Sequence, residues 1–277
     1  MSQEKVYPVA NIALSNTHLD REKYEKLYKK SIDFPEEFWA EQAKELLSWE
    51  KSWKGVTQGD FKDASNEWFP GAKLNVSYNC IDRHLDANGD QIAIIWEGDE
   101  PEDDAKITYK ELHKKVCKFA NALKTRGITK GDRVCIYMPM IPEATYAMLA
   151  CARIGAIHSV VFGGFSPDSI KDRILDSDCQ TVITADEGVR GGKLIPLKKN
   201  VDIALESCPA VHSVFVIRRT NAEVEWFDSR DVCYHKATES VNEICEPELM
   251  DAEDPLFILY TSGSTGKPKG VLHTTAG

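Results

Sequence analysis

Motifs that mark several common classes of protein are missing from this sequence. The eight cysteines lie at least twelve residues apart, so no CxxC pair is present to start a zinc site or a redox site. No GxGxxG, GxSxG or GxxxxGKS/T motif occurs, which excludes a Rossmann dinucleotide site, a hydrolase nucleophile elbow and the common NTPase P-loop. We therefore interpret most of the cysteines as small buried side chains in a reducing compartment.

An excess of positive charge and a long apolar run are also absent. The chain has 34 Lys and Arg residues against 44 Asp and Glu, a formal net charge of −10, so no nucleic acid is expected as a partner. The most apolar stretch, residues 147–165, contains Arg153 and His158, which argues against a membrane span. The N-terminus mixes charge, proline and asparagine, unlike a secretory signal. These features predict a cytoplasmic protein that does not associate with membranes.

From residue 92 onward, short apolar runs alternate with amphipathic segments. The runs predict strands at 92–96, 134–138, 157–162, 181–184, 214–217 and 256–260. The intervening segments predict helices at 108–127, 142–154, 166–178 and 196–207, and Thr108 with Glu111 forms a capping box at the start of the first. Apolar strands that alternate with helices indicate an α/β fold, a doubly wound and mostly parallel sheet with helices on both faces.

The part of the chain before residue 92 follows a different pattern. Charged or amphipathic segments predict helices at 20–30 and 35–48, and Pro35 followed by Glu36 and Glu37 suits a helix start. Residues 51–78 contain aromatic and glycine residues without a sustained period, so we expect them to be ordered but irregular.

The segment that follows the last predicted strand is dense in hydrogen-bond donors. It consists of Thr261, Ser262, Gly263, Ser264, Thr265, Gly266, Lys267, Pro268, Lys269 and Gly270. Glycines let backbone N–H groups turn toward one point, while hydroxyls and lysines add donors and positive charge. Open α/β sheets bind ligands at the carboxyl ends of their strands, so this segment is predicted to bind phosphate. The alternative is a flexible Gly/Ser linker, which would not normally follow an apolar strand and carry two lysines around a proline.

The sequence YTSGSTGKPKG at 260–270 resembles the signature phosphate loop of the adenylate-forming enzymes. Four longer stretches, at 68–85, 93–99, 137–167 and 254–277, resemble one family among them, the acetyl-CoA synthetases (acetate–CoA ligases). The resemblance covers the chain from about residue 34. It implies that residues 1–85 form the helical and irregular N-terminal extension of that family. Residues 86–277 would then be the first part of its AMP-forming domain, ending after the phosphate loop.

The resemblance also implies a coenzyme A site built from two segments. The first is Phe162, Gly163 and Gly164, and the second is Arg190, Gly191, Gly192 and Lys193. Glycines allow close approach of the backbone, and Arg and Lys suit phosphate groups. Without the resemblance, a tight strand-to-helix turn and a solvated turn would be the preferred interpretations of these segments.

The activity implied by the resemblance has two steps. Acetate attacks the α-phosphate of ATP to give acetyl-AMP and pyrophosphate, and the thiol of coenzyme A then takes the acetyl group and releases AMP. Residues 261–270 would hold the β and γ phosphates, with Mg²⁺ offsetting their charge. No resident metal site is expected. The sequence indicates no oligomeric state.

The chain matches nothing in the later elements of that family. These are the acyl pocket, the adenine segment, the ribose-binding Asp and the C-terminal domain with its catalytic Lys, so no catalytic residue is complete here. We therefore expect an N-terminal fragment that is inactive by itself. The alternatives are a stand-alone nucleotide-binding, coenzyme A-binding or interaction module, and a synthetase that prefers propionate. His84, His158 and His273 are interpreted as structural, and the acidic run at 99–104 as a solvated loop.

Overall fold

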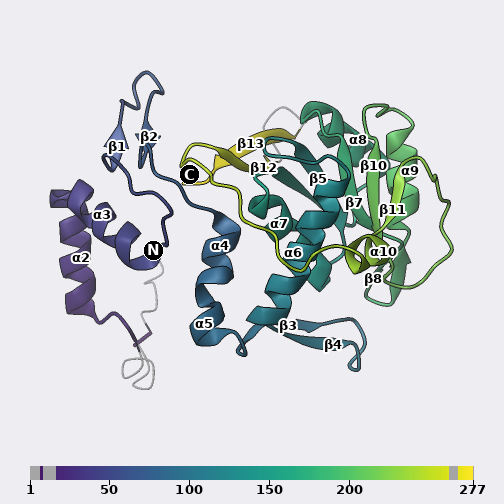
Figure 1. Cartoon of the computed structure of the whole chain (residues 1–277), viewed down its shortest axis with the longest axis horizontal. Helices are drawn as coiled ribbons and strands as arrows, with labels where there is room; N and C mark the ends of the chain where they lie inside the picture. The colour runs from purple at the N-terminus through teal and green to yellow at the C-terminus, as the bar shows by residue number, and fades with distance from the viewer. Residues whose placement is uncertain (1–6, 9–16, 262–267, 277) are drawn as a thin grey trace, which may run out of the picture.

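A seven-stranded sheet forms the centre of the molecule (Figure 1). The computed structural model describes residues 7–8, 17–261 and 268–276. The strands lie in the order β11 (Asp231–Cys233), β10 (Ser213–Ile217), β7 (Thr181–Ala185), β5 (Arg133–Met138), β6 (Ile157–Phe162), β12 (Pro255–Thr261) and β13 (Lys269–Thr274). Neighbouring strands are parallel except in the antiparallel hairpin β12–β13. This confirms the predicted mostly parallel α/β sheet.

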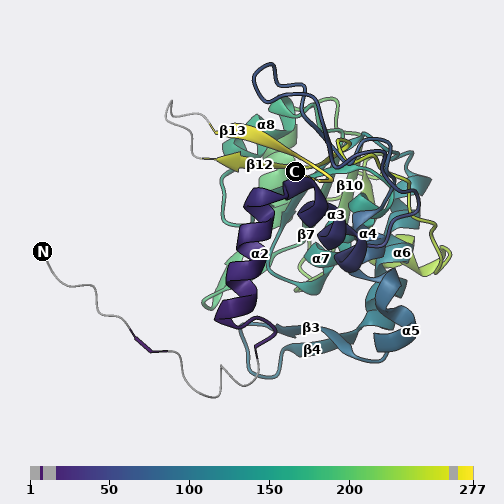
Figure 2. The same cartoon turned by 90° about the vertical axis from the view of Figure 1, so that its left-hand side faces the viewer.

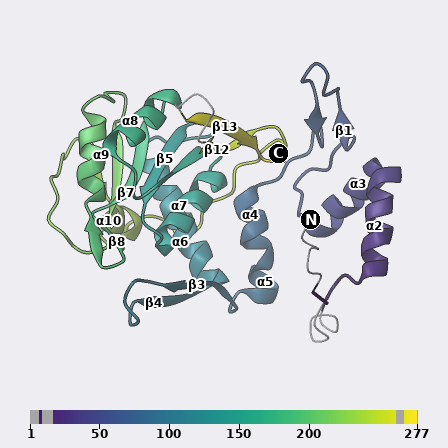
Figure 3. The same cartoon turned by 180° about the vertical axis from the view of Figure 1, so that it is seen from behind.

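Helices cover both faces of this sheet (Figures 1 and 3). One face carries α6 (Tyr109–Thr125), which contacts α7 (Pro142–Arg153) and α10 (Tyr234–Glu239). The other face carries α8 (Pro167–Asp176) and α9 (Leu197–Leu205), which contact each other. The strand order explains the change of face, because β6 and β7 lie on opposite sides of β5 and right-handed crossovers place the connecting helices on opposite faces. No helix in the described part of the chain combines the length and the apolar character needed to cross a bilayer.

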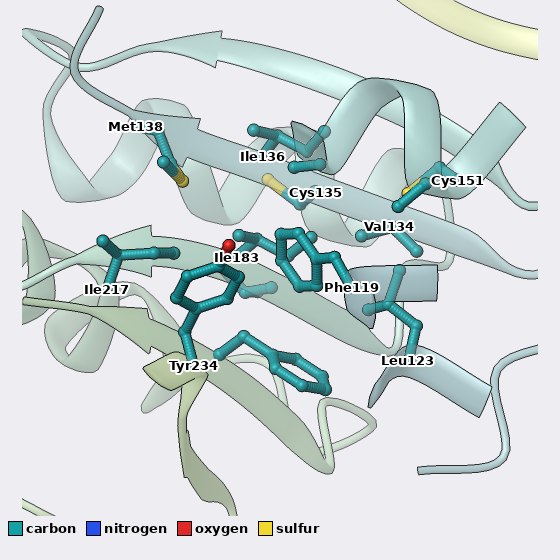
Figure 4. Close-up of a cluster of buried hydrophobic side chains, with 14 of the residues drawn as sticks. Phe119, Leu123, Val134, Cys135, Ile136, Met138, Cys151, Ile183, Ile217 and Tyr234 are labelled. Carbon is teal, nitrogen blue, oxygen red and sulfur yellow. The ribbon is translucent and has the colours of Figure 1, made fainter. Parts of the chain in front are cut away.

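Helix α6 shows how the sequence directs one element into the core. The Thr108 hydroxyl accepts a hydrogen bond from the Glu111 N–H, and the Glu111 carboxylate accepts one from the Thr108 N–H. Beyond the last turn, Gly127 takes a left-handed φ of 82°, which favours glycine. The apolar stripe is buried, and Phe119 packs edge-on against Tyr234 with ring centroids 4.8 Å apart (Figure 4). Burial of such a side chain contributes roughly 1.5–3 kcal/mol.

The cysteines lie mostly in the core, as predicted. The buried ones are Cys117, Cys135, Cys151, Cys179, Cys208 and Cys245. Cys80 is exposed and Cys233 is half-buried, so the interpretation does not extend to these two. Burial raises the pKa of the Cys135 and Cys151 thiols, which keeps them protonated and unreactive.

An ion cluster of the buried Arg153 with the half-buried Asp82 and His113 joins the N-terminal region to the helices of one face. Both Nη atoms of Arg153 donate to the Asp82 carboxylate at 2.8 Å, and His113 Nε2 lies 3.3 Å from Asp82 Oδ1. Burial acts to raise the pKa of Asp82, but hydrogen bonds from Arg153 and His113 outweigh it and lower the pKa to about 2. The hydrogen bond with Asp82 raises the pKa of His113 to about 9. At neutral pH the cluster therefore holds two positive groups around one carboxylate.

The N-terminal region stands beside the sheet and contributes no strand to it (Figures 1 and 2). Its elements are α2 (Arg21–Asp33), α3 (Pro35–Leu46), β1 (Thr57–Gln58), β2 (Glu67–Trp68), α4 (Val76–Cys80), a 3-10 turn (Asp82–His84) and α5 (Leu85–Asn88). The first two correspond to the predicted helices at 20–30 and 35–48. Residues 51–78 are largely irregular, as expected, apart from the short antiparallel pair β1–β2 and the start of α4.

The predicted strand at 92–96 is present but lies outside the main sheet. β3 (Ile92–Glu97) pairs antiparallel with β4 (Asp104–Thr108) in a separate ribbon (Figures 1 and 2). The expectation that this run joins the parallel sheet is therefore wrong. No residue of β3 is buried, whereas every residue of β7 is, and the short connection at 98–103 can join β3 and β4 only as antiparallel neighbours. The acidic run at 99–104 is also not simply solvated, since Asp103 forms an ion pair with Arg219 and Asp104 begins β4.

Candidate functional site

The carboxyl ends of the parallel strands gather at one edge of the sheet, where the predicted site segments follow them. β6 ends at Phe162 and is followed by Gly163 and Gly164, while β12 ends at Thr261. β7 ends at Ala185 and is followed by a hairpin of β8 (Gly188–Arg190) and β9 (Lys193–Ile195). Because β5, β6, β7 and β12 run in the same direction, this edge collects all of these segments.

The two ends of the predicted phosphate-binding segment face each other across a hairpin. Thr261 in β12 is paired with Lys269 in β13, and both residues are exposed. The residues between them that carry most of the prediction lie outside the described residues; they are Ser262, Gly263, Ser264, Thr265, Gly266 and Lys267. The hairpin therefore locates where the segment leaves the sheet and where it returns.

The turn after β6 requires glycine for a physical reason. A Cβ atom on Gly163 would lie 2.9 Å from the backbone oxygen of Met138, at the end of the neighbouring strand β5. The Tyr137 hydroxyl donates to the Phe165 backbone oxygen at 2.8 Å and accepts from Asn200 Nδ2 at 3.2 Å. Burial raises the pKa of Tyr137, so its hydroxyl keeps its proton and fixes the turn.

The hairpin after β7 brings two positive side chains together. Gly191 and Gly192 have φ values of 56° and 72°, as a two-residue primed turn requires. This turn pairs Arg190 directly with Lys193, and both side chains are exposed. Like charges opposite each other across a strand pair are destabilising, so this tip is suited to an anion that lies between them. The Gly192 N–H donates to the Asp99 carboxylate at 3.3 Å, which ties the turn to the acidic run.

Aromatic contacts connect the segments with one another. The Arg190 guanidinium lies 5.0 Å from the centroid of the Phe162 ring, so the two predicted coenzyme A segments are in contact. The Phe162 and Phe165 rings meet edge to face at 5.6 Å. Arg173 of α8 lies 4.9 Å from the Phe165 centroid and 5.2 Å from that of Tyr260, which precedes Thr261. Sequence reasoning did not assign a role to Arg173, and although Phe165 and Tyr260 adjoin the predicted segments, no motif indicated that they contact Arg173.

The histidines and acidic groups fit structural positions. Burial lowers the pKa of His158 to about 4, and its ring lies 5.6 Å from that of Phe257, which stacks on His273 at 4.5 Å. The His84 ring packs against Tyr109. Across residues 7–8, 17–261 and 268–276, no group of three or more His, Cys, Asp or Glu side chains is arranged to hold a metal ion.

Comparison with protein-family models gives two matches. The model described as "AMP-binding enzyme" matches residues 81–277, and the model described as "Acetyl-coenzyme A synthetase N-terminus" matches residues 24–80. Among solved structures, the acetoacetyl-CoA synthetase from Streptomyces lividans superposes with a TM-score of 0.83 at 27% identity, covering 96% of this chain and 40% of that one. The similarity supports the α/β fold described above.

Curated relatives share much higher identity. The acetyl-coenzyme A synthetase of Saccharophagus degradans is 62% identical over all of this chain, which spans 43% of the relative. Acetyl-coenzyme A synthetase 2 of Pseudomonas putida is 65% identical over 98% of this chain and 42% of its own length. The chain thus spans less than half the length of these relatives, the shortfall expected from the sequence. With one family model covering more than half of its residues and another its N-terminal region, this chain belongs to the AMP-binding enzymes and is similar throughout to the acetyl-coenzyme A synthetases.

Proposed function

We propose that this chain supplies the triphosphate site and the coenzyme A site of an AMP-forming acetate–CoA ligase. One observation carries the proposal. Arg190 and Lys193 face each other across a hairpin, and Arg190 stacks on Phe162. This pair lies at the same edge of the sheet as the two ends of the phosphate-binding segment. The names of the relatives, at 62% and 65% identity, support acetate as the acyl substrate.

The proposed substrates are MgATP, acetate and coenzyme A. An acetate oxygen attacks the α-phosphorus of ATP, the bond from that phosphorus to the β-phosphate oxygen breaks, and pyrophosphate leaves. The sulfur of coenzyme A then bonds to the acetyl carbon, the thiol loses its proton, and AMP leaves. Thr261, Lys269 and the residues between them would hold the β and γ phosphates, since N–H, hydroxyl and ammonium donors stabilise charge on the departing pyrophosphate.

The coenzyme A site would combine the turn after β6 with the β8–β9 hairpin. Arg190 and Lys193 would bind its phosphates, Gly163 and Gly164 would admit its chain close to the backbone, and Gly191 with Gly192 would set the tip of the hairpin. We assign no catalytic residue within this chain and expect binding without turnover. The cytoplasmic location, and the division into residues 1–85 and 86–277, belong to the same proposal.

Isothermal titration calorimetry of the 277-residue chain tests the proposal. We expect binding of MgATP and of coenzyme A, and loss of one charged contact in Arg190→Ala or Lys193→Ala should weaken coenzyme A binding roughly tenfold or more. Lys199→Ala is the matched control, because Lys199 is exposed on α9 and has no place in the hairpin. Binding of neither ligand would refute the proposal.

A second assay tests the expected inactivity of this chain and its acyl preference. It measures the acetate-dependent exchange of labelled pyrophosphate into ATP, with propionate as the comparison substrate. We expect no exchange from this chain alone. Exchange with acetate would overturn the expectation of inactivity and establish the first step directly. Faster exchange with propionate than with acetate would show that propionate is the preferred substrate.

A further inference from the structure

Arg173 on α8 is a buried cation with an unusual set of partners. Its side chain is only 7% exposed, and its guanidinium lies between the rings of Phe165 and Tyr260, at 4.9 Å and 5.2 Å from their centroids. Nη1 donates to the Ser169 backbone oxygen at 2.7 Å. Within the ranges that the structure describes, no carboxylate forms an ion pair with Arg173. Removal of a charge from water is costly, so the two aromatic faces are its main compensation.

The two rings belong to different parts of the proposed site. Phe165 follows the Gly163–Gly164 turn, and Tyr260 directly precedes Thr261 at the end of β12. Helix α8 lies beside the ends of β12 and β13 in two perpendicular views (Figures 1 and 2). Arg173 is therefore a single side chain that contacts both the strand leading into the phosphate-binding segment and the coenzyme A turn.

Helix α8 holds Tyr260 at a second point. The Tyr260 hydroxyl donates to the Asp176 carboxylate at 2.7 Å, so the ring is fixed by its face and by its hydroxyl. A hollow of about 370 Å³ lies against this contact, lined by Asp172, Arg173, Leu175, Asp176, Tyr260 and Pro268. Two aspartates line the hollow and would repel a phosphate group. We therefore interpret Arg173 as a partner of the two aromatic rings and not as an anion-binding residue.

We propose that Arg173 is a positioning residue. By stacking on Tyr260 and Phe165, it fixes the β12–β13 hairpin and the turn after β6 in one arrangement. The proposal rests on the proposed function for its purpose, because acyl transfer needs the adenylate and the thiol in a fixed relative geometry. Two sites that share one rigid element are coupled, so ordering of one lowers the cost of ordering the other.

Hydrogen exchange measured by mass spectrometry tests the positioning directly, without any ligand. In Arg173→Met, which keeps apolar bulk but removes the charge, amides at 160–166 and at 256–261 should exchange roughly tenfold faster. The matched control is Arg133→Met. Arg133 binds the backbone oxygen of Ser177 and the Asp178 carboxylate in the turn that directly follows α8, so its loss should loosen that turn without reaching either ring. Faster exchange in one segment only, in neither, or equally in both variants overturns the proposal.

Calorimetry with coenzyme A and with MgATP is the second test of the proposal. Arg173→Met should weaken the binding of both ligands roughly tenfold. Its thermal unfolding midpoint should fall no further than that of Arg133→Met. Arg173→Lys should be intermediate, because an ammonium can contact a ring but cannot lie flat between two. Unchanged affinities beside faster exchange would make Arg173 a stability residue only and overturn the proposal. If the unmodified chain binds neither ligand, the proposed function fails, while the exchange result still decides the role of Arg173.

Discussion

Substitution of His113 by glutamine should remove a pH-dependent part of the stability of this chain. His113 Nε2 lies 3.3 Å from the Asp82 carboxylate, which raises the pKa of His113 from 6.5 to about 9. Folding therefore favours the protonated ring. Its contribution to the free energy of unfolding is fully present below pH 6.5 and is lost as the pH rises through about 9.

The size of this contribution follows from the same pKa change. At full value, a rise from 6.5 to about 9 corresponds to roughly 3 kcal/mol. Solvent screening of this partly exposed pair reduces the expected contribution to about 2 kcal/mol. Asp82 behaves in the opposite sense, because its lowered pKa stabilises the fold above 3.8 and this gain is lost as the pH falls toward about 2.

Urea unfolding followed by tryptophan fluorescence measures the effect. The stability difference between the unmodified chain and His113→Gln should be about 2 kcal/mol larger at about pH 6 than at about pH 9.5. His84→Gln is the control, since the His84 ring packs against Tyr109 outside the cluster. A stability difference for His113→Gln that is the same at both pH values would refute the reasoning.

Three further substitutions probe the packing around the site. Gly163→Ala should destabilise the chain by about 1–3 kcal/mol and abolish coenzyme A binding, because its Cβ would lie 2.9 Å from the Met138 oxygen; unchanged calorimetry would contradict this. Tyr137→Phe should cost about 1 kcal/mol in urea unfolding through the loss of the hydroxyl that holds the turn, and a neutral result would show that the bond contributes nothing. Lys198→Met should cost about 1.5–3 kcal/mol, because the buried Asp231 loses the ammonium 2.8 Å away and keeps only Arg230 as its ion-pair partner, and a melting temperature equal to that of Lys199→Met would be evidence against it.

Local rules were enough to predict much of the sheet and its helices. The capping box at Thr108 and the stripe ending at Gly127 locate α6, and apolar runs locate β5, β6, β7 and β10. The same rules placed β3 in the wrong sheet, because an apolar run specifies a strand but not its partner. The strands β8, β9 and β11 have three residues each, which is too short for any period to be visible.

The segments of the candidate site could be named from the sequence, but the contacts between them could not. Resemblance indicated Phe162 and Arg190 separately, yet their stacking depends on where the hairpin after β7 folds back. Arg173 was expected only as part of a helix, and its position between two rings depends on residues 87 positions apart in the chain. Such long-range pairings follow from topology, which local composition does not encode.

The opposed charges of Arg190 and Lys193 have a practical consequence at the bench. If the hairpin binds the phosphates of coenzyme A as proposed, sulfate and inorganic phosphate, which are compact dianions, should compete for its tip. Affinities measured in phosphate-buffered saline would then understate the true value, whereas chloride and a zwitterionic buffer leave the tip free. Ammonium sulfate, as a crystallisation precipitant, would for the same reason place an anion at this hairpin.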